Sequence, residues 1–376
     1  MKLALAQFNP RVGDIEGNAT RMIEIAQQTA GQGADVLVFP ELALCGYPPE
    51  DLLLRPSMDK RVARELQRIA AAAQDTAILV GYPAVRDGQR RNICGCFYRG
   101  ECLHEYAKSE LPNYRVFDEK RYFEPGEDVG LFEFRGERIG LLICEDLWQA
   151  GPVQRLSKHN PDLVLVLNAS PFHGEKHPDR LNMLKKQQAH LGCPVIYLNA
   201  VGGQDELVFD GDSMALNRAG DLIYQAAWFD PCQFMLEFAG GELAPVGDAK
   251  PDLAVPEPMQ ALYEALKLGL RDYVDKNGFP GVVLGLSGGI DSALTLAIAV
   301  DALGADRVEA IMMPFRYTSD LSQSAAAMQA QWLGVSYRSI SIEPGYDTIY
   351  ASLADEFSGF KTDITEQNIQ ARLRGV

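Results

Sequence analysis

The stretch that decides the fold of the chain's second half reads Leu284-Gly285-Leu286-Ser287-Gly288-Gly289-Ile290-Asp291-Ser292-Ala293-Leu294-Thr295. An apolar run, residues 282–286, stops here at a cluster of small and polar residues. Apolar residues at helical spacing begin directly afterwards, at Ala293 and Leu294. An apolar run, a small-residue break and a helical pattern predict a strand, a tight loop and a helix in that order.

This loop has the composition of an anion-binding site. Gly288 and Gly289 allow the backbone to come close to a ligand and to adopt positive φ angles. Ser287 and Ser292 add hydroxyl donors, and the start of the following helix adds backbone N–H groups and the positive end of its dipole. Asp291 is a carboxylate among these groups, and we interpret it as a ligand for a divalent cation that bridges it to a phosphate.

Two common phosphate-binding loops are excluded by the sequence. No lysine is present for a Walker motif, and the glycines lack the Gly-x-Gly-x-x-Gly spacing of a dinucleotide-binding loop. The Ser-Gly-Gly-Ile-Asp-Ser motif resembles the pyrophosphate loop of the ATP pyrophosphatase superfamily, whose members adenylylate a substrate and release pyrophosphate. The resemblance implies ATP and Mg²⁺, with Asp291 as the metal ligand. The ATP-binding residues that it implies are Ser287, Gly288, Gly289, Ile290, Asp291, Ser292 and Met313. The alternative is an ordinary strand-to-helix turn without a ligand.

The charge and the cysteine content narrow the class of protein. The 376 residues carry a formal net charge of −16, which disfavours nucleic acid and anionic membranes as partners because an acidic surface repels phosphates. Seven cysteines are an odd number in a chain without a secretory start, which favours reduced thiols. No apolar run reaches transmembrane length. We therefore expect a cytoplasmic protein that acts on small molecules.

The order of the elements predicts an α/β protein with two domains. Strands, helices and hairpins mix over residues 1–240, which is typical of a layered α/β domain with mixed sheets. Residues 241–258 are rich in Gly, Ala, Pro, Asp and Glu and are expected to be a linker. Residues 259–376 alternate helix and strand again, which predicts a doubly wound parallel sheet. Helices are expected at 18–30, 62–73, 179–191, 259–276 and 322–333.

Three residues in the first domain indicate a second chemical centre. Glu41 and Cys144 each follow an apolar run that reads as a buried strand, and Lys108 follows a predicted strand pair. Reactive residues at strand ends are where α/β domains place their sites. A thiol, a base and a cation are sufficient for acyl transfer through a thioester. Taken singly, each residue has an ordinary structural explanation, so the prediction depends on all three converging.

Together with their flanking residues, these three positions resemble the Glu-Lys-Cys triad of the nitrilase, or carbon–nitrogen hydrolase, superfamily. The matching stretches are 38–42, 108–114, 117–119, 121–123, 143–148 and 168–171. The resemblance implies an α-β-β-α sandwich over residues 1–240. It also implies that Glu119 lies near Lys108 and that the backbone N–H of Glu145 stabilises an oxyanion. The amide substrate's pocket is then expected to be lined by Tyr114, Trp148 and Ser170.

The two halves in this order resemble the family of glutamine-dependent NAD synthetases. Membership would mean that ammonia from glutamine amidates adenylylated nicotinic acid adenine dinucleotide, with release of AMP and pyrophosphate. Residues 313–319 and 365–375 add to the match, and by this resemblance Arg372 contacts the dinucleotide. A homo-oligomer is the expected assembly.

Some features depart from the family pattern and leave alternatives open. Ala325 replaces an acidic residue, and the family continues beyond the position of Val376 with a Thr-Gly-Asn-Lys stretch, so the match covers only part of its synthetase domain. The alternatives are a stand-alone amidase, an amidotransferase for another adenylylated carboxylate, or a second domain that binds nucleotide without catalysis. His173 and His177 lack the spacing of a metal site, and we expect them to be solvated.

Overall fold

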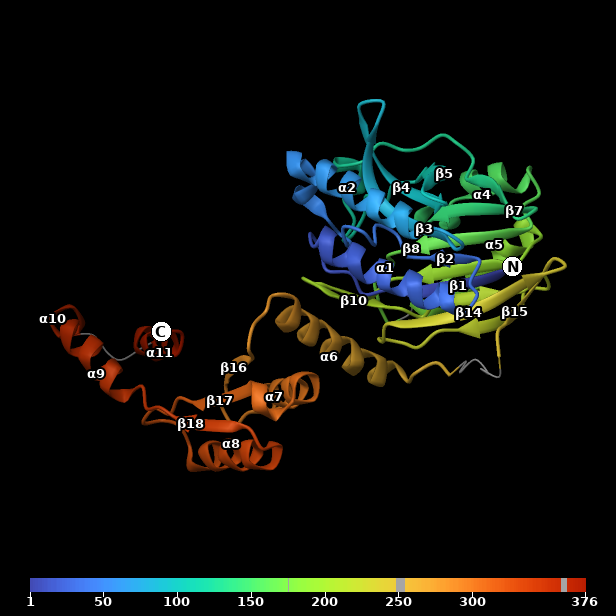
Figure 1. Cartoon of the computed structure of the whole chain (residues 1–376). Coiled ribbons are helices and arrows are strands. Elements are labelled where there is room, and N and C mark those ends of the chain that lie inside the picture. Colours follow the sequence, from blue (N-terminus) through green and yellow to red (C-terminus); the bar gives the residue numbers. More distant parts are fainter. Residues whose placement is uncertain (175, 248–253, 360–363) are drawn as a thin grey trace. The chain divides into compact units, whose positions relative to one another are not determined.

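The computed structural model of the chain describes residues 1–174, 176–247, 254–359 and 364–376 (Figure 1). These residues form two compact units, Met1–Ala265 and Leu266–Val376, and the division falls within a single helix, α6 (Pro258–Lys276). Part of the predicted linker, residues 248–253, lies outside the described residues. Each unit is described by itself below.

The first unit is built from two large sheets. One has seven strands in the order β15-β14-β1-β2-β3-β4-β5, and the other has six in the order β13-β12-β9-β8-β7-β6. In sequence these strands are β1 (Lys2–Gln7), β2 (Val36–Val38), β3 (Ala77–Arg86), β4 (Gln89–Tyr98), β5 (Glu101–Ala107), β6 (Leu131–Phe134), β7 (Glu137–Ile143), β8 (Leu163–Asn168), β9 (Val195–Asn199), β12 (Met214–Leu216), β13 (Leu222–Gln225), β14 (Cys232–Ala239) and β15 (Glu242–Pro245). A separate hairpin pairs β10 (Val201–Gln204) with β11 (Leu207–Asp210).

Helices cover the outer faces of both sheets. They are α1 (Ile15–Gly31), α2 (Pro56–Ala72), α3 (Glu145–Trp148), α4 (Ala150–Ser157) and α5 (Lys176–Leu191), with short 3₁₀ turns η1 (Glu50–Leu54) and η2 (Glu119–Arg121). One buried cluster joins α1 and α2 to the first sheet, a second lies between the sheets, and a third joins α4 and α5 to the second sheet. The predicted α-β-β-α sandwich is therefore confirmed (Figure 1).

Parallel pairing places several strand ends at one edge of each sheet. Strands β1, β2 and β3 are parallel neighbours in the first sheet, and β7, β8 and β9 are parallel neighbours in the second. All residues of β2 and β8 are buried, as expected of apolar strands covered on both faces. The carboxyl ends of these strands carry the residues of the site described below.

Some boundaries differ from the sequence-based expectation for identifiable reasons. Helix α1 begins at Ile15 rather than at residue 18 because Asp14 caps it, accepting a hydrogen bond from the N–H of Gly17 at 3.1 Å. Helix α2 begins at Pro56, a residue suited to the first helical position. The linker prediction was wrong for residues 242–245, because β15 pairs with β14 there and extends the first sheet.

The second unit contains a three-stranded parallel sheet. Its order is β16-β17-β18, with a core formed by the sheet and the helices that connect its strands. The elements are β16 (Val282–Gly285), α7 (Ile290–Leu303), η3 (Ala305–Arg307), β17 (Val308–Met312), α8 (Asp320–Leu333), β18 (Ser336–Ser339), α9 (Glu343–Ser352), α10 (Ala354–Phe357) and α11 (Ile364–Leu373). The predicted strand, loop and helix around residues 284–295 are β16, the following loop and α7.

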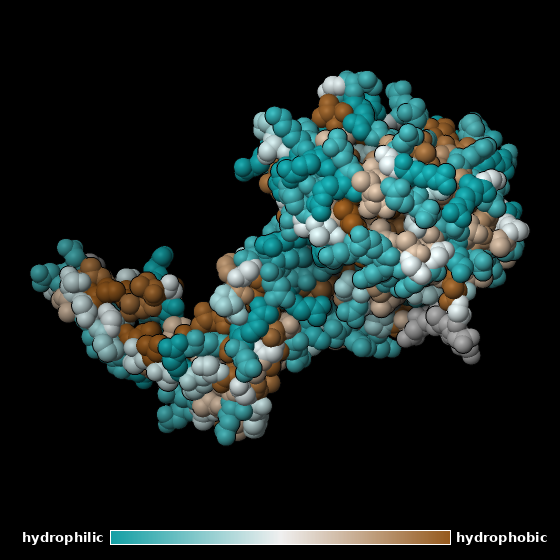
Figure 2. All heavy atoms as spheres, viewed as in Figure 1, coloured by the Kyte–Doolittle hydropathy of each residue, from teal (hydrophilic) through white to brown (hydrophobic). Residues whose placement is uncertain are grey.

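The surface agrees with the hydropathy of the sequence. Much of the face of the first unit seen in Figure 2 is hydrophilic, with hydrophobic residues scattered over it. Within the part of the chain that the structure describes, none of the helices is both long and apolar enough to cross a membrane.

Candidate active site

The structure brings Glu41 and Lys108 into direct contact. Glu41 follows β2 and Lys108 follows β5, and Nζ of Lys108 lies 2.6 Å from Oε1 of Glu41. The same ammonium lies 2.8 Å from Oε1 of Glu119, which places Glu119 beside Lys108 as the sequence indicated. The side chains of Glu41 and Lys108 have no exposed surface. Because the ammonium of Lys108 is buried, its charge has to be compensated by these two carboxylates.

Two further donors hold the Glu41 carboxylate. The side-chain amide of Asn92, on β4, donates to Oε1 at 2.8 Å, and the backbone N–H of Ala169 donates to Oε2 at 3.0 Å. With Lys108, three donors from three different segments converge on this one carboxylate. Neither residue was assigned a role from the sequence: Asn92 belongs to no recognisable motif, and Ala169, although it lies in the matching stretch 168–171, acts through its backbone N–H. The pairing of β4 with β3 places Asn92 opposite the Glu41 loop.

Cys144 sits in a strained turn between β7 and α3. Its φ is +46°, a region that residues other than glycine rarely occupy, at a strain of roughly 1–3 kcal/mol. Neighbouring hydrogen bonds maintain the turn: the N–H of Cys144 donates to the carbonyl of Leu167 at 3.0 Å, and the N–H of Ile143 donates to Oδ2 of Asp146 at 3.0 Å. A strand-to-helix turn held in this way fixes the direction of the nucleophile's side chain.

The electrostatics of the three residues are coupled. Burial, followed by the charge of Glu41, raises the pKa of the Cys144 thiol well above its ordinary value, and Lys108 opposes this rise. Burial by itself would lower the pKa of Lys108, but the carboxylates of Glu119 and Glu41 raise it well above its ordinary value. These shifts favour the protonated thiol of Cys144 and the charged ammonium of Lys108.

The expected pocket residues lie around the nucleophile's turn. The hydroxyl of Tyr114 donates to Oε2 of Glu145 at 2.9 Å, and Glu145 itself follows Cys144 in the chain. The ammonium of Lys176, at the start of α5, lies 4.5 Å from the centre of the Trp148 ring, a cation–π contact. Burial and Arg180 lower the pKa of Lys176, whereas the charges of Cys144 and Glu145 act to raise it.

Ser170 lies at the end of β8, where its main chain is bonded on both sides. Its N–H donates to Oδ1 of Asn199 at 2.9 Å, and its carbonyl accepts from Arg180 at 2.7 Å. Lys176 and Arg180 were both missed at the level of sequence. The only signal for them was the cluster of basic residues after Pro171, which reads equally well as a solvated helix face.

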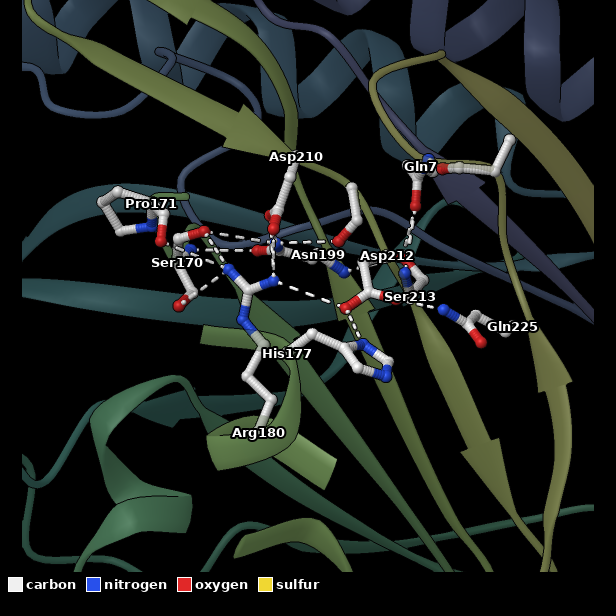
Figure 3. Close-up of polar contacts among 12 residues, drawn as sticks. Gln7, Ser170, Pro171, His177, Arg180, Asn199, Asp210, Asp212, Ser213 and Gln225 are labelled. Atoms are coloured by element: carbon white, nitrogen blue, oxygen red, sulfur yellow. Dashed lines mark hydrogen bonds and ion pairs between the residues drawn. The ribbon is translucent and has the colours of Figure 1, made fainter. Parts of the chain in front are cut away.

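The expectation that His177 is solvated was wrong. His177 lies within α5, is 9% exposed, and its Nδ1 is 2.7 Å from Oδ2 of Asp212. It belongs to a buried charged network with Arg180 and Asp210 (Figure 3). The polar composition of the segment concealed this burial, because a buried polar side chain is acceptable wherever a charged partner meets it.

The glycine-rich loop of the second unit has the geometry of a ligand cradle. Gly288 has a φ of +80°, and a Cβ atom there would lie 2.2 Å from the carbonyl oxygen of Ser322. Oγ of Ser292 accepts from the N–H of Ser287 at 3.2 Å and donates to the carbonyl of Gly289 at 2.9 Å. These bonds keep the loop open at the start of α7, where backbone N–H groups favour an anion.

A cavity of about 230 Å³ adjoins this loop. Ser287 and Met313, both expected to bind ATP, line it, and so does Arg374. Arg372, the residue expected to contact the dinucleotide, is exposed and does not line this cavity. Nε of Arg374 donates to the carbonyl of Met313 at 3.3 Å, which ties the end of α11 to the cavity wall.

Asp291 is the expected metal ligand, and its side chain is exposed at the first turn of α7. In the described parts of the chain, no cluster of three or more His, Cys, Asp or Glu side chains is placed to hold a metal ion. A single exposed carboxylate nevertheless fits Mg²⁺ bound mainly through substrate phosphates, because this ion commonly uses one or two carboxylates in phosphate sites.

Comparison with known proteins matches two families along the chain. Residues 2–231 match the carbon–nitrogen hydrolase family and residues 262–376 match the NAD synthase family. The fold and the two family matches thus define a carbon–nitrogen hydrolase joined to a synthetase. The chain is 44% identical over 376 residues to a glutamine-dependent NAD(+) synthetase from Acinetobacter baylyi, covering all of this chain and 69% of that protein. The chain belongs to the family of glutamine-dependent NAD(+) synthetases, which are ATP-dependent enzymes.

Solved structures show the same two relationships. The glutamine-dependent NAD+ synthetase from Acinetobacter baumannii in complex with adenosine diphosphate superposes with a TM-score of 0.94 at 44% identity, over 100% of this chain and 71% of that one. An amidase from Nesterenkonia sp. AN1, with acrylamide added at its active site cysteine, superposes with a TM-score of 0.58 at 26% identity. That match covers 64% of this chain and 93% of the amidase.

Proposed function

We propose that Cys144, Glu41 and Lys108 release ammonia from glutamine, and that the loop 287–292 binds the ATP that activates nicotinic acid adenine dinucleotide. The observation that carries the first half is the buried contact of Lys108 with Glu41, whose charges both act on the Cys144 thiol. A thiol, a base and a cation in one buried site are the groups that thioester chemistry requires. The modified active site cysteine of the Nesterenkonia amidase supports the same kind of nucleophile.

In the acylation step, Sγ of Cys144 attacks the side-chain amide carbon of glutamine while Glu41 takes the thiol proton. The carbonyl π electrons move to oxygen, where Lys108 and the backbone N–H of Glu145 stabilise the charge. Glu41 then returns the proton to the amide nitrogen. The carbon–nitrogen bond breaks, ammonia leaves, and a glutamyl thioester remains on Cys144.

In the second step, water replaces the nitrogen. Glu41 takes a proton from the water as its oxygen attacks the thioester carbon, and Lys108 again faces the developing oxyanion. The carbon–sulfur bond then breaks, the thiolate takes the proton from Glu41, and glutamate leaves. The residues end in the protonation states in which they began.

The charged groups around the pocket suit the amino acid end of glutamine. The ammonium of Lys176 has the charge and donors to bind the α-carboxylate, and the Trp148 ring beneath it limits its rotamers. The carboxylate of Glu145, oriented by the Tyr114 hydroxyl, has the charge to bind the α-ammonium. A plain amide lacks both of these groups.

The second unit would bind the triphosphate of ATP. Backbone N–H groups of the loop 287–292 and the start of α7 favour phosphate oxygens, and Asp291 would hold a Mg²⁺ ion that offsets phosphate charge. The nicotinate carboxylate attacks the α-phosphate, pyrophosphate leaves, and an acyl adenylate forms. Ammonia then attacks the acyl carbon, AMP leaves with its bonding electrons, and loss of a proton gives the amide.

The test is ammonia release from glutamine by the wild-type chain and by the C144A and E41Q variants. We expect no hydrolysis by C144A and a loss of roughly 10²–10⁴-fold in kcat for E41Q, the range for a missing general base. Hydrolysis that survives C144A would reject the nucleophile. Pyrophosphate release from ATP, measured with ammonium chloride as the nitrogen source, tests the second half of the proposal. We expect this release to depend on nicotinic acid adenine dinucleotide.

We further propose a homo-oligomer in the cytoplasm. Helix α8 exposes large apolar side chains, with Leu321 and Trp332 78% and 75% exposed, and Figure 2 shows hydrophobic residues gathered on the visible face of the second unit. Such residues favour a covering partner. All seven cysteines are free thiols, which is typical of a reducing compartment. Sedimentation velocity at several protein concentrations tests the assembly.

A further inference from the structure

A buried cluster of charges lies beside the wall of the proposed glutamine pocket. It consists of Arg180, Asp210, Asp212 and His177, and we call it the Arg180 cluster (Figure 3). Arg180 and both aspartates are 0% exposed. Nη1 of Arg180 lies 2.8 Å and 2.9 Å from the two carboxylate oxygens of Asp210 and 3.6 Å from Oδ2 of Asp212. The proposed glutamine chemistry assigns no role to these four residues.

The second terminal nitrogen of the guanidinium, Nη2, bonds to the pocket wall. Nη2 of Arg180 donates to the carbonyl of Ser170 at 2.7 Å, and it lies 3.3 Å from both the Ser170 hydroxyl and the carbonyl of Pro171. Figure 3 shows the guanidinium reaching from its helix toward Ser170 and Pro171. One terminal nitrogen of this fixed, charged guanidinium therefore bonds to the main chain at Ser170 and Pro171, where the pocket wall begins.

The same cluster fixes the other end of the wall. Lys176 and Arg180 are four residues apart on α5 and so lie on the same face of the helix, one turn from each other. His177, next to Lys176 in the chain, bonds to Asp212 at 2.7 Å. Asp212 in turn accepts from Nε2 of Gln225 at 2.7 Å. Ordering of the Lys176 ammonium above Trp148 thus depends on the helix turn that the cluster anchors.

We propose that the Arg180 cluster positions Ser170 and Lys176 and thereby sets the enzyme's selectivity for glutamine over plain amides. This inference rests on the proposed function, since it assigns the wall to glutamine. The hydrogen bonds of Arg180 go to Asp210, Ser170 and Pro171, and it acts through Ser170 and Lys176 as a positioning residue. Its loss should therefore impair recognition of the amino acid end more than the chemistry of the amide.

The substitution R180K separates these effects. Lysine keeps the positive charge beside Asp210, but its single ammonium does not reproduce the planar guanidinium that bonds Asp210 and Ser170 together. The matched control is T76V, which removes a buried side-chain hydrogen bond, 2.7 Å from the Thr76 hydroxyl to the Ala34 carbonyl, outside the pocket. Thermal unfolding of both variants shows that each remains folded at the assay temperature.

Two amides are compared as substrates: glutamine, and butyramide, which lacks the α-ammonium and the α-carboxylate. For R180K we expect kcat/KM for glutamine to fall about tenfold or more, chiefly through KM, with less than about a twofold change for butyramide, because small displacements of a positioning group have large effects. T76V should leave the ratio of the two kcat/KM values unchanged. An equal fall for both amides, or an unchanged ratio in R180K, would overturn the inference.

A second variant and a substrate-free measurement complete the test. D212A removes the acceptor of the His177 bond without touching Ser170, and the glutamine-to-butyramide ratio should fall in it as well. If R180K fails to fold, D212A decides the matter by the same criterion. Alkylation of Cys144 by iodoacetamide, followed by mass spectrometry, should proceed at the wild-type rate in both variants. Failure of the proposed function is recognised separately, because glutamine hydrolysis would then survive C144S in the wild-type background.

Discussion

Nζ of Lys108 lies 2.6 Å from Oε1 of Glu41, and neither side chain has any exposed surface. Because the ammonium also contacts Glu119 at 2.8 Å, one cation serves two buried carboxylates. The arrangement is asymmetric: removing a carboxylate leaves Lys108 with another partner, whereas removing the cation leaves two like charges without one. The proposed catalytic residues therefore also affect the stability of the fold.

The first prediction follows from this asymmetry. K108M should lower the free energy of unfolding by about 3–5 kcal/mol, the range for breaking a buried ion pair, because it leaves Glu41 and Glu119 uncompensated. E41Q should destabilise less, since Lys108 retains Glu119. Urea unfolding monitored by circular dichroism measures both. Equal destabilisation, or a larger effect in E41Q, would contradict the charge balance described here.

The protonation of Cys144 gives a prediction about pH. Burial and the charge of Glu41 raise the pKa of this thiol, so below that raised pKa the resting enzyme holds a proton on sulfur. Without glutamine, alkylation by iodoacetamide should be slow at pH 7 and should still be rising above about pH 8.5, where a free cysteine is half ionised. A rate that levels off below neutral pH would indicate a preformed thiolate and would remove the need for Glu41 as base.

Asn92 provides a prediction that sequence motifs do not. Its amide donates to the same Glu41 oxygen as Lys108, and the residue is 1% exposed. N92A should reduce kcat for glutamine roughly 10- to 100-fold while KM changes little, because a misplaced base slows the chemistry without touching the pocket. N92D should be worse, since it sets a carboxyl group against Glu41. Steady-state kinetics with T76V as the stability control decides; a change confined to KM would refute the role.

The sequence-based prediction of the two sites has a physical basis. Glu41 and Cys144 were identifiable because each follows an apolar strand, and the ends of buried strands in layered α/β domains carry reactive groups. Lys108 follows the more polar strand β5 and was identified by its match to the family motif. The loop after β16 was identifiable because its small residues are constrained by the backbone geometry itself, as the φ of Gly288 shows. Where local chemistry and strand pattern agree, a sequence is sufficient.

The residues that were missed depend on contacts between distant segments. Asn92 reaches Glu41 across 51 positions in sequence, and Arg180 reaches Asp210 across 30. Neither residue differs in its local pattern from an ordinary strand or helix position. His177 was misplaced for the same reason: its partner Asp212 lies on a separate segment, and pairing is what makes its burial acceptable. Strand β15 was hidden by the loop-like composition of its hairpin with β14.

Gly288 and its neighbour provide a matched pair in the phosphate loop. G288A should abolish pyrophosphate release and weaken ATP binding, because the new Cβ would meet the Ser322 carbonyl oxygen at 2.2 Å in a backbone conformation of positive φ. At Gly289 the nearest atom is Oγ of Ser287 at 3.4 Å, so G289A should bind ATP with an affinity close to that of the wild type. Isothermal titration calorimetry with ATP compares them. Equal losses of ATP affinity in G288A and G289A would show that the effect of substitution in this loop is not steric.

The sequence-based expectation and the structure point to different arginines, Arg372 and Arg374, as the residue that contacts a ligand. Arg372 was expected to contact the dinucleotide, but Arg374 lines the cavity beside Ser287 and bonds to the carbonyl of Met313. R374A should weaken binding at this cavity by about 1.5–3 kcal/mol, the range for a lost hydrogen bond to a charged group, whereas R372A should leave ATP affinity unchanged. Separate titrations with ATP and with nicotinic acid adenine dinucleotide assign the roles. If R372A alone weakens the dinucleotide, each arginine serves a different ligand; if R372A weakens ATP and R374A does not, the assignment to Arg374 is wrong.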